Sequence, residues 1–128
     1  MVGLLVVAII LAISGRFVSV SCVPPAVLHG YAGYAAPDGQ VLLADEAVCS
    51  RLAHPRWPGF WFALFTVVHE AEHVAGVAGE RQADCVALAD LRWVARRFFH
   101  LSGRLLASVL REARAYHAVE PAPYSGAC

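Results

Sequence analysis

The fold and the chemistry of this chain depend on residues 69–88, which read HEAEHVAGVAGERQADCVAL. They follow FWFALFTVV at 60–68, a run so apolar that the helix it begins must be buried. Residues 69–88 nevertheless hold two histidines and four carboxylates, in a chain of 128 residues of which only 16% are charged. Burying ionisable groups is costly unless they are paired or bind a metal. We therefore expect these polar side chains to form a site.

Residues 69–73, His-Glu-Ala-Glu-His, form an HExxH motif. Helical residues four apart share a face, so the imidazoles of His69 and His73 can bind one cation. Glu70 projects about 100° further round the helix, beside the metal, where it can take a proton from a metal-bound water. Neutral imidazole suits Zn²⁺, and a catalytic zinc has three protein ligands and one water. The alternative is that both histidines are hydrogen-bonded core or surface residues.

A third ligand is expected from the carboxylates that follow the glycine-containing turn at 74–79. Glu80 and Asp84 are again four residues apart and share a face of the next helix. We predict Glu80 as the ligand and Asp84 as the residue that holds a histidine in one tautomer, or as the alternative ligand. Glu80 could instead cap the helix N-terminus, and Asp84 could be an ordinary polar residue. Glu72 points away from the histidine face and is expected to be solvated or salt-bridged.

This pattern resembles that of the zincin metallopeptidases, and more narrowly of the gluzincins, in which ExxxD downstream of HExxH supplies a glutamate ligand and a supporting aspartate. The resemblance implies the following roles: zinc ligands His69, His73 and Glu80, general base Glu70, and supporting residue Asp84. The six residues at 74–79 are a much shorter interval than those enzymes have.

The stretch is also similar to a group of small, poorly characterised bacterial proteins with HExxH, a glycine and then E-x-x-x-[DE]-C-x-A-L. Those chains likewise carry a short β segment and a cysteine before the motif, as in VLLADEAVC, and a Tyr–Cys tail, as in YSGAC. This likeness covers most of residues 30–128. It implies kinship of fold more than a known activity, and it leaves Asp84 open as the ligand in place of Glu80.

The remaining pattern predicts a mainly helical α+β chain with a short β segment near its N-terminus. Helices are expected at about 59–75, from 80 through 99, at 104–117 and, more briefly, from 45. The resemblance implies a compact zincin-like, metal-binding domain over 22–128. In zincins an edge strand above the metal helix pairs with substrate, and 41–44 is the candidate for it here, unless it is a core strand.

The apolar run at residues 1–14 has the length of a signal-peptide core and falls short of a bilayer span of ~20 residues. We predict that residues 1–21 are a signal peptide or a membrane anchor, which would contact a membrane through residues 2–14. The alternative is a buried N-terminal helix. The chain is therefore expected to be secreted or membrane-anchored, outside the cytoplasm.

Four cysteines, Cys22, Cys49, Cys85 and Cys128, fit two disulfides in an oxidising compartment. Among the three connectivities, we favour Cys49–Cys85 inside the core and Cys22–Cys128 joining the ends. A free buried thiol at Cys85 and a cysteine zinc ligand are alternatives. The sequence has no CxxC pair, which argues against a structural zinc ribbon.

Composition excludes several classes of protein. An apolar content of 59% is too high for a disordered chain. Net charge is zero, the ten basic residues are scattered arginines, and no nucleic-acid partner is expected. The aromatic residues near the motif are expected in the core: Phe60, Phe62, Phe65, Trp57 and Trp61. The candidates for stabilising an oxyanion are Tyr31, Tyr34, His54, His100, Tyr116 and His117.

Two functions follow from these patterns. The first is a zinc metallopeptidase that hydrolyses a peptide or protein substrate through metal-bound water, with Glu70 as general base. The second is a non-catalytic module outside the cytoplasm, in which zinc only ties two helices together. A glutamate directly after His69 favours the enzyme, because a structural site does not need it. The small size of the chain favours the module.

Overall fold

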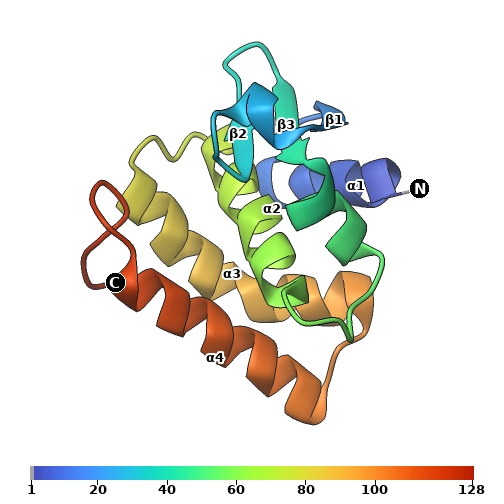
Figure 1. The fold of residues 1–128 in the computed structure, drawn as a ribbon, viewed down its shortest axis with the longest axis vertical. Coiled ribbons are helices and arrows are strands. Elements are labelled where there is room, and N and C mark those ends of the chain that lie inside the picture. Colours follow the sequence, from blue (N-terminus) through green and yellow to red (C-terminus); the bar gives the residue numbers. More distant parts are fainter. Residues whose placement is uncertain (1) are drawn as a thin grey trace.

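Helix α2 (Phe60–Val74) lies at the centre of the molecule, and the other elements pack around it. Twelve of its fifteen residues are buried, as its apolar sequence predicts. Helix α1 (Val2–Ser14) and a small sheet lie on one side of it, and α3 (Glu80–Phe99) and α4 (Gly103–Val119) on the other (Figure 1). The structure, a computed structural model, describes residues 2–128.

The mainly helical α+β class predicted from the sequence is confirmed. The three long helices expected from the sequence are present, each within two residues of its expected bounds. Gly59 has φ 86° just before α2, a left-handed conformation that suits glycine at a sharp entry to the helix. The tight turn at Gly59 leads the chain from the surface directly into the buried, almost wholly apolar helix α2.

The sheet has three strands, β1 (Ser19–Val23), β2 (Gly33–Ala35) and β3 (Gln40–Ala44), in the order β1-β3-β2. Strand β3 runs parallel to β1 and antiparallel to β2. The strand expected at 41–44 is therefore present, and of the two alternatives left open for it, an edge strand or a core strand, the second holds. It is central because strands on both sides use its backbone groups. The strand that packs against α2 is β2.

Two short helical segments complete the N-terminal half, a 3₁₀ turn η1 (Pro25–Leu28) and a π-helical segment η2 (Asp45–Ser50). The helix expected from residue 45 is thus present: residues 45–50 have π-helical hydrogen bonding, and Arg51 and Leu52 continue the helical stretch. It follows β3 directly, so it lies close to β1, the parallel neighbour of β3.

The favoured disulfide pairing is wrong, because the structure joins Cys22 to Cys49 and Cys85 to Cys128. Cys22 lies on β1 beside β3, and η2 places Cys49 next to it. The C-terminal segment turns back from the end of α4 toward the first turns of α3, where Cys85 lies (Figure 1). Two disulfides are typical of proteins in an oxidising compartment outside the cytoplasm.

The apolar N-terminal segment forms α1, which packs along α2. Val6, Ile9 and Ile10 are fully buried in the core, whereas Leu4 is 72% exposed. Within residues 2–128, no helix has both the length and the apolar character needed to cross a bilayer.

Three of the five aromatic residues expected in the core lie in it or against it; Phe62 is only half-buried and packs on the rings of Trp61 and Tyr116, and Trp57 lies outside the core. Phe60 and Phe65 are buried, and Trp61 packs against the core from its rim. Trp57 is 53% exposed and stacks on His54, with 3.6 Å between ring centroids, so its predicted core position is wrong. It belongs to the Pro-rich turn before α2, which lies on the surface.

Candidate metal centre

The two histidines of the motif meet Glu80 at one end of the α2–α3 pair. The Nε2 atoms of His69 and His73 are 3.0 Å apart. Glu80 Oε1 lies 3.0 Å from the first and 2.6 Å from the second. We call these three residues the open cluster. The structure therefore brings together the three residues predicted to bind the metal, and they form a group able to hold an ion.

The turn between α2 and α3 makes this meeting possible. Gly76 has φ 106°, a left-handed conformation that lets the chain reverse directly after the helix. Val77 N–H then donates to Glu72 O, and α3 begins at Glu80. The six-residue interval is thus long enough to bring the first turn of α3 back beside the last turn of α2.

The outer nitrogens of both histidines are occupied by acceptors. His73 Nδ1 lies 2.7 Å from the carbonyl oxygen of Val77, and His69 Nδ1 lies 2.6 Å from Asp84 Oδ1. A carbonyl or carboxylate oxygen only accepts, so each Nδ1 must carry the hydrogen. Each neutral imidazole then presents an Nε2 lone pair to the open cluster.

The two Nε2 atoms and Glu80 Oε1 are therefore three acceptors that lie 2.6–3.0 Å from one another, with no hydrogen between them when both imidazoles are neutral. Such an arrangement is repulsive unless a cation or an added proton lies between them. Two imidazole nitrogens and one carboxylate oxygen are a donor set that suits Zn²⁺ and leaves a coordination position open. The residues present therefore fit the metal that the sequence predicts.

The charged groups around His69 also favour a cation at this position. Burial alone would lower its pKa, but the hydrogen bond to Asp84 and the neighbouring carboxylates raise the pKa above its usual value. Asp84 responds in the opposite sense: burial would raise its pKa, but its hydrogen bonds, led by that from His69, lower it. The surroundings of the ring thus favour a positive charge at this position.

Glu70 lies beside the open cluster but outside it. Its side chain is buried, accepts a hydrogen bond from the backbone N–H of Ala35 on β2, and lies against Gly33 and Thr66. Burial raises the pKa of Glu70, partly offset by the two histidines. The carboxyl group thus lies next to His69, His73 and Glu80 without belonging to the open cluster.

A cavity of about 810 Å³ opens beside these residues. Glu70, His73 and Glu80 line it on one side, and β2 and the segment before it line the other. Most of its wall is apolar. Tyr31 and Tyr34, two of the residues expected as candidates to stabilise an oxyanion, face it, and so does Tyr124, the tyrosine of the YSGAC tail.

Tyr124 comes from the C-terminal segment, and its ring centroid lies 5.9 Å from that of His69. Burial raises the pKa of its hydroxyl, with the charges of Glu80 and Glu70 adding to the effect, so Tyr124 stays a hydrogen-bond donor. Its segment is fixed by the Cys85–Cys128 disulfide and by Arg81, which donates to Ala127 O at 2.9 Å.

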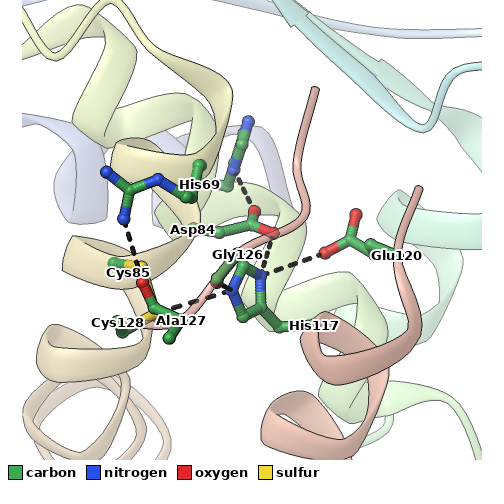
Figure 2. Close-up of a disulfide and its surroundings, with 9 residues drawn as sticks. His69, Asp84, Cys85, His117, Glu120, Gly126, Ala127 and Cys128 are labelled. Carbon is green, nitrogen blue, oxygen red and sulfur yellow. Dashed lines mark hydrogen bonds and ion pairs between the residues drawn. A yellow bond between two sulfur atoms is a disulfide. The ribbon is translucent and has the colours of Figure 1, made fainter. Parts of the chain in front are cut away.

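A second polar group lies on the other side of His69, as Figure 2 shows. Asp84 joins His69 to His117, whose Nδ1 is 2.7 Å from Asp84 Oδ2. Glu120, the residue directly after α4, points at the same nitrogen from 3.6 Å. We call Asp84, His117 and Glu120 the closed cluster, because their side chains are only 2–8% exposed.

Asp84 thus lies where the sequence predicts a supporting residue. Of the remaining oxyanion candidates, His117 belongs to the closed cluster, and Tyr116 packs among the rings of Trp61, Phe62 and Phe65. His54 and His100 line a separate hollow that also contains Trp57 and Phe99, at the other end of α2.

The expectation that Glu72 is solvated or salt-bridged is wrong. Its side chain faces α3 in the interior, and burial and then the nearby Asp90 raise its pKa to about 8. Within residues 2–128 its Oε2 has no hydrogen-bond partner. The reason is that α2 is covered on nearly all sides, so no face of this helix is left for a charged residue.

Comparisons with protein families, with curated proteins and with solved structures give no match to this chain. The candidate site therefore rests on the geometry of its own residues.

Proposed function

We propose that this protein is a zinc-dependent metallopeptidase of the zincin type that acts outside the cytoplasm on a peptide or protein substrate. One observation carries the proposal. Two imidazole lone pairs and a carboxylate oxygen converge on one point, next to a cavity that Glu70 also lines. A structural zinc is normally enclosed by four protein ligands, whereas a catalytic zinc keeps one position free.

His69, His73 and Glu80 would hold the zinc ion, each histidine through Nε2. Zinc supplies Lewis acidity there, and it lowers the pKa of water in contact with it to about 7. The outer hydrogen bonds to Asp84 and Val77 keep both rings in the tautomer that zinc requires.

Glu70 would act as the general base by accepting a proton from the attacking water on its carboxylate. Its hydrogen bond from Ala35 and its contact with Gly33 keep the carboxylate beside the cavity. The same residue can then pass the proton to the leaving amine, because it lies on the side of the site that substrate would occupy.

Tyr124 would donate a hydrogen bond to the carbonyl oxygen of the substrate as negative charge develops there. Its place on the cavity wall near His69 supports this role. Substrate would lie in extended form along the edge of β2 that faces away from β3. Ala32 and Ala36 use their backbone groups to bond to β3 or the turn beside it, whereas Gly33 and Ala35 lie toward Glu70, on the side of the proposed site.

The test is Glu70→Gln, with Glu112→Gln as matched control because Glu112 is exposed on α4. Glu70→Gln should retain zinc and lose at least ~100-fold in cleavage of a quenched fluorescent peptide library, the usual contribution of a general base. Glu112→Gln should behave as the wild type. Zinc per chain is measured by elemental analysis of both variants. Wild-type protein that takes up no zinc would contradict the proposal.

A non-catalytic, zinc-stabilised module is the second candidate, and one observation favours it. The open cluster joins the last turn of α2 to the first turn of α3, so a metal there would tie the two helices together. In that case Glu70→Gln would leave all measured properties unchanged, whereas His73→Ala would unfold the chain.

A further inference from the structure

The closed cluster has an arrangement of charge that the proposed peptidase does not use. Asp84 approaches His117 from α3 and Glu120 from the residue directly after α4, beneath the C-terminal segment (Figure 2). Within residues 2–128 neither carboxylate forms an ion pair with an arginine. Two carboxyl groups this deeply buried each need a proton, a hydrogen-bond donor or a cation as partner.

The tautomer of His117 shows where that partner would lie. His117 Nε2 is 2.8 Å from the carbonyl oxygen of Gly126, which only accepts, so the hydrogen is on Nε2. A neutral ring would then present its Nδ1 lone pair to carboxylate oxygens, so a proton or a cation must lie between Nδ1 and these oxygens. Nδ1 faces Asp84 Oδ2 at 2.7 Å and Glu120 Oε1 at 3.6 Å.

The side chain of Glu120 gives a second indication of a bound cation. It is only 8% exposed, and in the part of the chain that the structure describes its Oε1 has no hydrogen-bond partner. That oxygen is directed at the Nδ1 atom of His117. A buried carboxylate oxygen left without a partner is costly, and a cation would satisfy it.

We propose that Asp84, His117 and Glu120 bind a second divalent cation, of the borderline transition-metal class that accepts one imidazole nitrogen and carboxylate oxygens. Each residue offers one ligand atom, and the three atoms lie within 4.8 Å of one another. Zn²⁺ and Mn²⁺ both tolerate this donor set. The nearby cysteine sulfurs do not take part, because they are joined in the Cys85–Cys128 disulfide.

The second cation would differ in role from the first. The closed cluster shares no ligand atom with the open cluster, since Asp84 uses Oδ2 here and Oδ1 toward His69. A cation there would join α3 and α4 and fix the carboxylate that orients His69. It is a structural site, because its ligands are sealed from the cavity.

The experiment is metal stoichiometry with Zn²⁺ as probe on the full chain. Protein stripped with a chelator is reloaded, dialysed and analysed for zinc, and the binding heats are recorded in parallel. Wild type and the control Glu112→Gln should bind two zinc ions per chain. Glu120→Gln should bind one, and so should His73→Ala. The double variant should bind none.

These outcomes separate the two proposals. One zinc in the wild type, lost in His73→Ala and kept in Glu120→Gln, would overturn the second site and leave the proposed metallopeptidase intact. The reverse pattern would do the opposite. If Glu120→Gln does not fold, anomalous scattering at the zinc edge from wild-type crystals decides the matter: a peak between His117 Nδ1 and Glu120 Oε1 is expected, and its absence refutes the second site.

Discussion

The open and closed clusters meet at the two nitrogens of His69 and differ in what can reach them. On the Nε2 side, His73 and Glu80 border a cavity of about 810 Å³, and the side chain of Glu80 is 34% exposed. On the Nδ1 side, the closed cluster is almost fully buried. Both contain histidine and carboxylate. The two clusters therefore differ in access and not in residue type: a substrate could reach the open cluster, whereas the closed cluster is sealed from the cavity.

The two clusters have a common origin in helix geometry. Glu80 and Asp84 are one turn apart on α3, so the same helix face reaches both sides of His69. His117 and Glu120, three residues apart at the end of α4, complete the closed side. The C-terminal segment then covers the closed side and contributes Tyr124 to the open one.

The largest effect is expected from removing a ligand of the open cluster. His73→Ala in a Glu120→Gln background, where only the open cluster can bind zinc, should weaken zinc binding by more than ~100-fold, beyond the range typical of supporting residues. Peptide cleavage should fall below detection. Competition with a chelator measures the affinity. His54→Ala, an exposed histidine, serves as control. An unchanged affinity would remove the distinction between the clusters.

The two disulfides offer a second test of the comparison. They close 27 and 43 residues, so replacing either pair by serine should cost about 3.5 and 4 kcal/mol of unfolding free energy, respectively. Denaturant unfolding measures both. Only the variant lacking Cys85–Cys128 should also weaken the closed cluster and lower cleavage, because it releases the segment that holds Gly126 and Tyr124. Equal effects on cleavage would show that this segment has no special role.

Much of the open cluster could be predicted from the sequence because it depends on local geometry. The spacing of His69 and His73 on one helix, and of Glu80 and Asp84 on the next, follows from 3.6 residues per turn. A glycine after α2 predicts the reversal that brings the two helices together. The long helices and the mainly helical fold follow from apolar periodicity in the same way.

Most of the errors, though not that at Trp57, concern contacts between segments far apart in the sequence. The partner of Cys85 is 43 residues away, and periodicity does not determine which cysteine reaches it. The same holds for Tyr124 and for the roles of His117 and Glu120, which depend on the C-terminal segment folding back over α3. Asp84 lies directly before Cys85, so a Cys85–Cys128 pairing was the one signal that would have placed the C-terminal segment, and with it Tyr124, beside the candidate site.

Strand β2 was missed for a related reason. Its three residues, Gly33–Ala35, lie in a stretch rich in glycine and tyrosine that predicts loop. It is a strand because β3 offers it a free edge and α2 covers it. The central place of β3 could not be predicted without β1 and β2.

A smaller effect is expected where the two clusters connect. Asp84→Asn keeps an oxygen that can accept a hydrogen bond from His69 Nδ1–H. It removes the negative charge that lies between His69 and His117. Zinc affinity of the open cluster should fall by about 10- to 100-fold, the range for residues that orient a ligand. Chelator competition in the Glu120→Gln background measures this effect, with the exposed Glu112→Gln as control. A loss as large as that of His73→Ala would mean that Asp84 is itself a ligand of the catalytic metal.

The smallest effect should come from Gly33, which lies against Glu70, the proposed base, and against none of the residues of the open cluster. A Cβ atom at this position would lie 3.0 Å from Glu70 Cγ, 3.1 Å from Glu70 Oε2 and 3.1 Å from Thr66 Cγ2. These contacts are too short, so Gly33→Ala must shift Glu70 or β2 by a few tenths of an ångström. Misplacement of a catalytic group lowers the rate steeply, and we expect kcat to fall up to ~10-fold. Zinc affinity should not change, because Glu70 lies outside the open cluster. Gly3→Ala, at which nothing lies within 4 Å, is the control and should leave kcat unchanged. If Gly33→Ala lowered zinc affinity and spared kcat, Glu70 would belong with the ligands, and the open cluster would be a closed structural site like its neighbour.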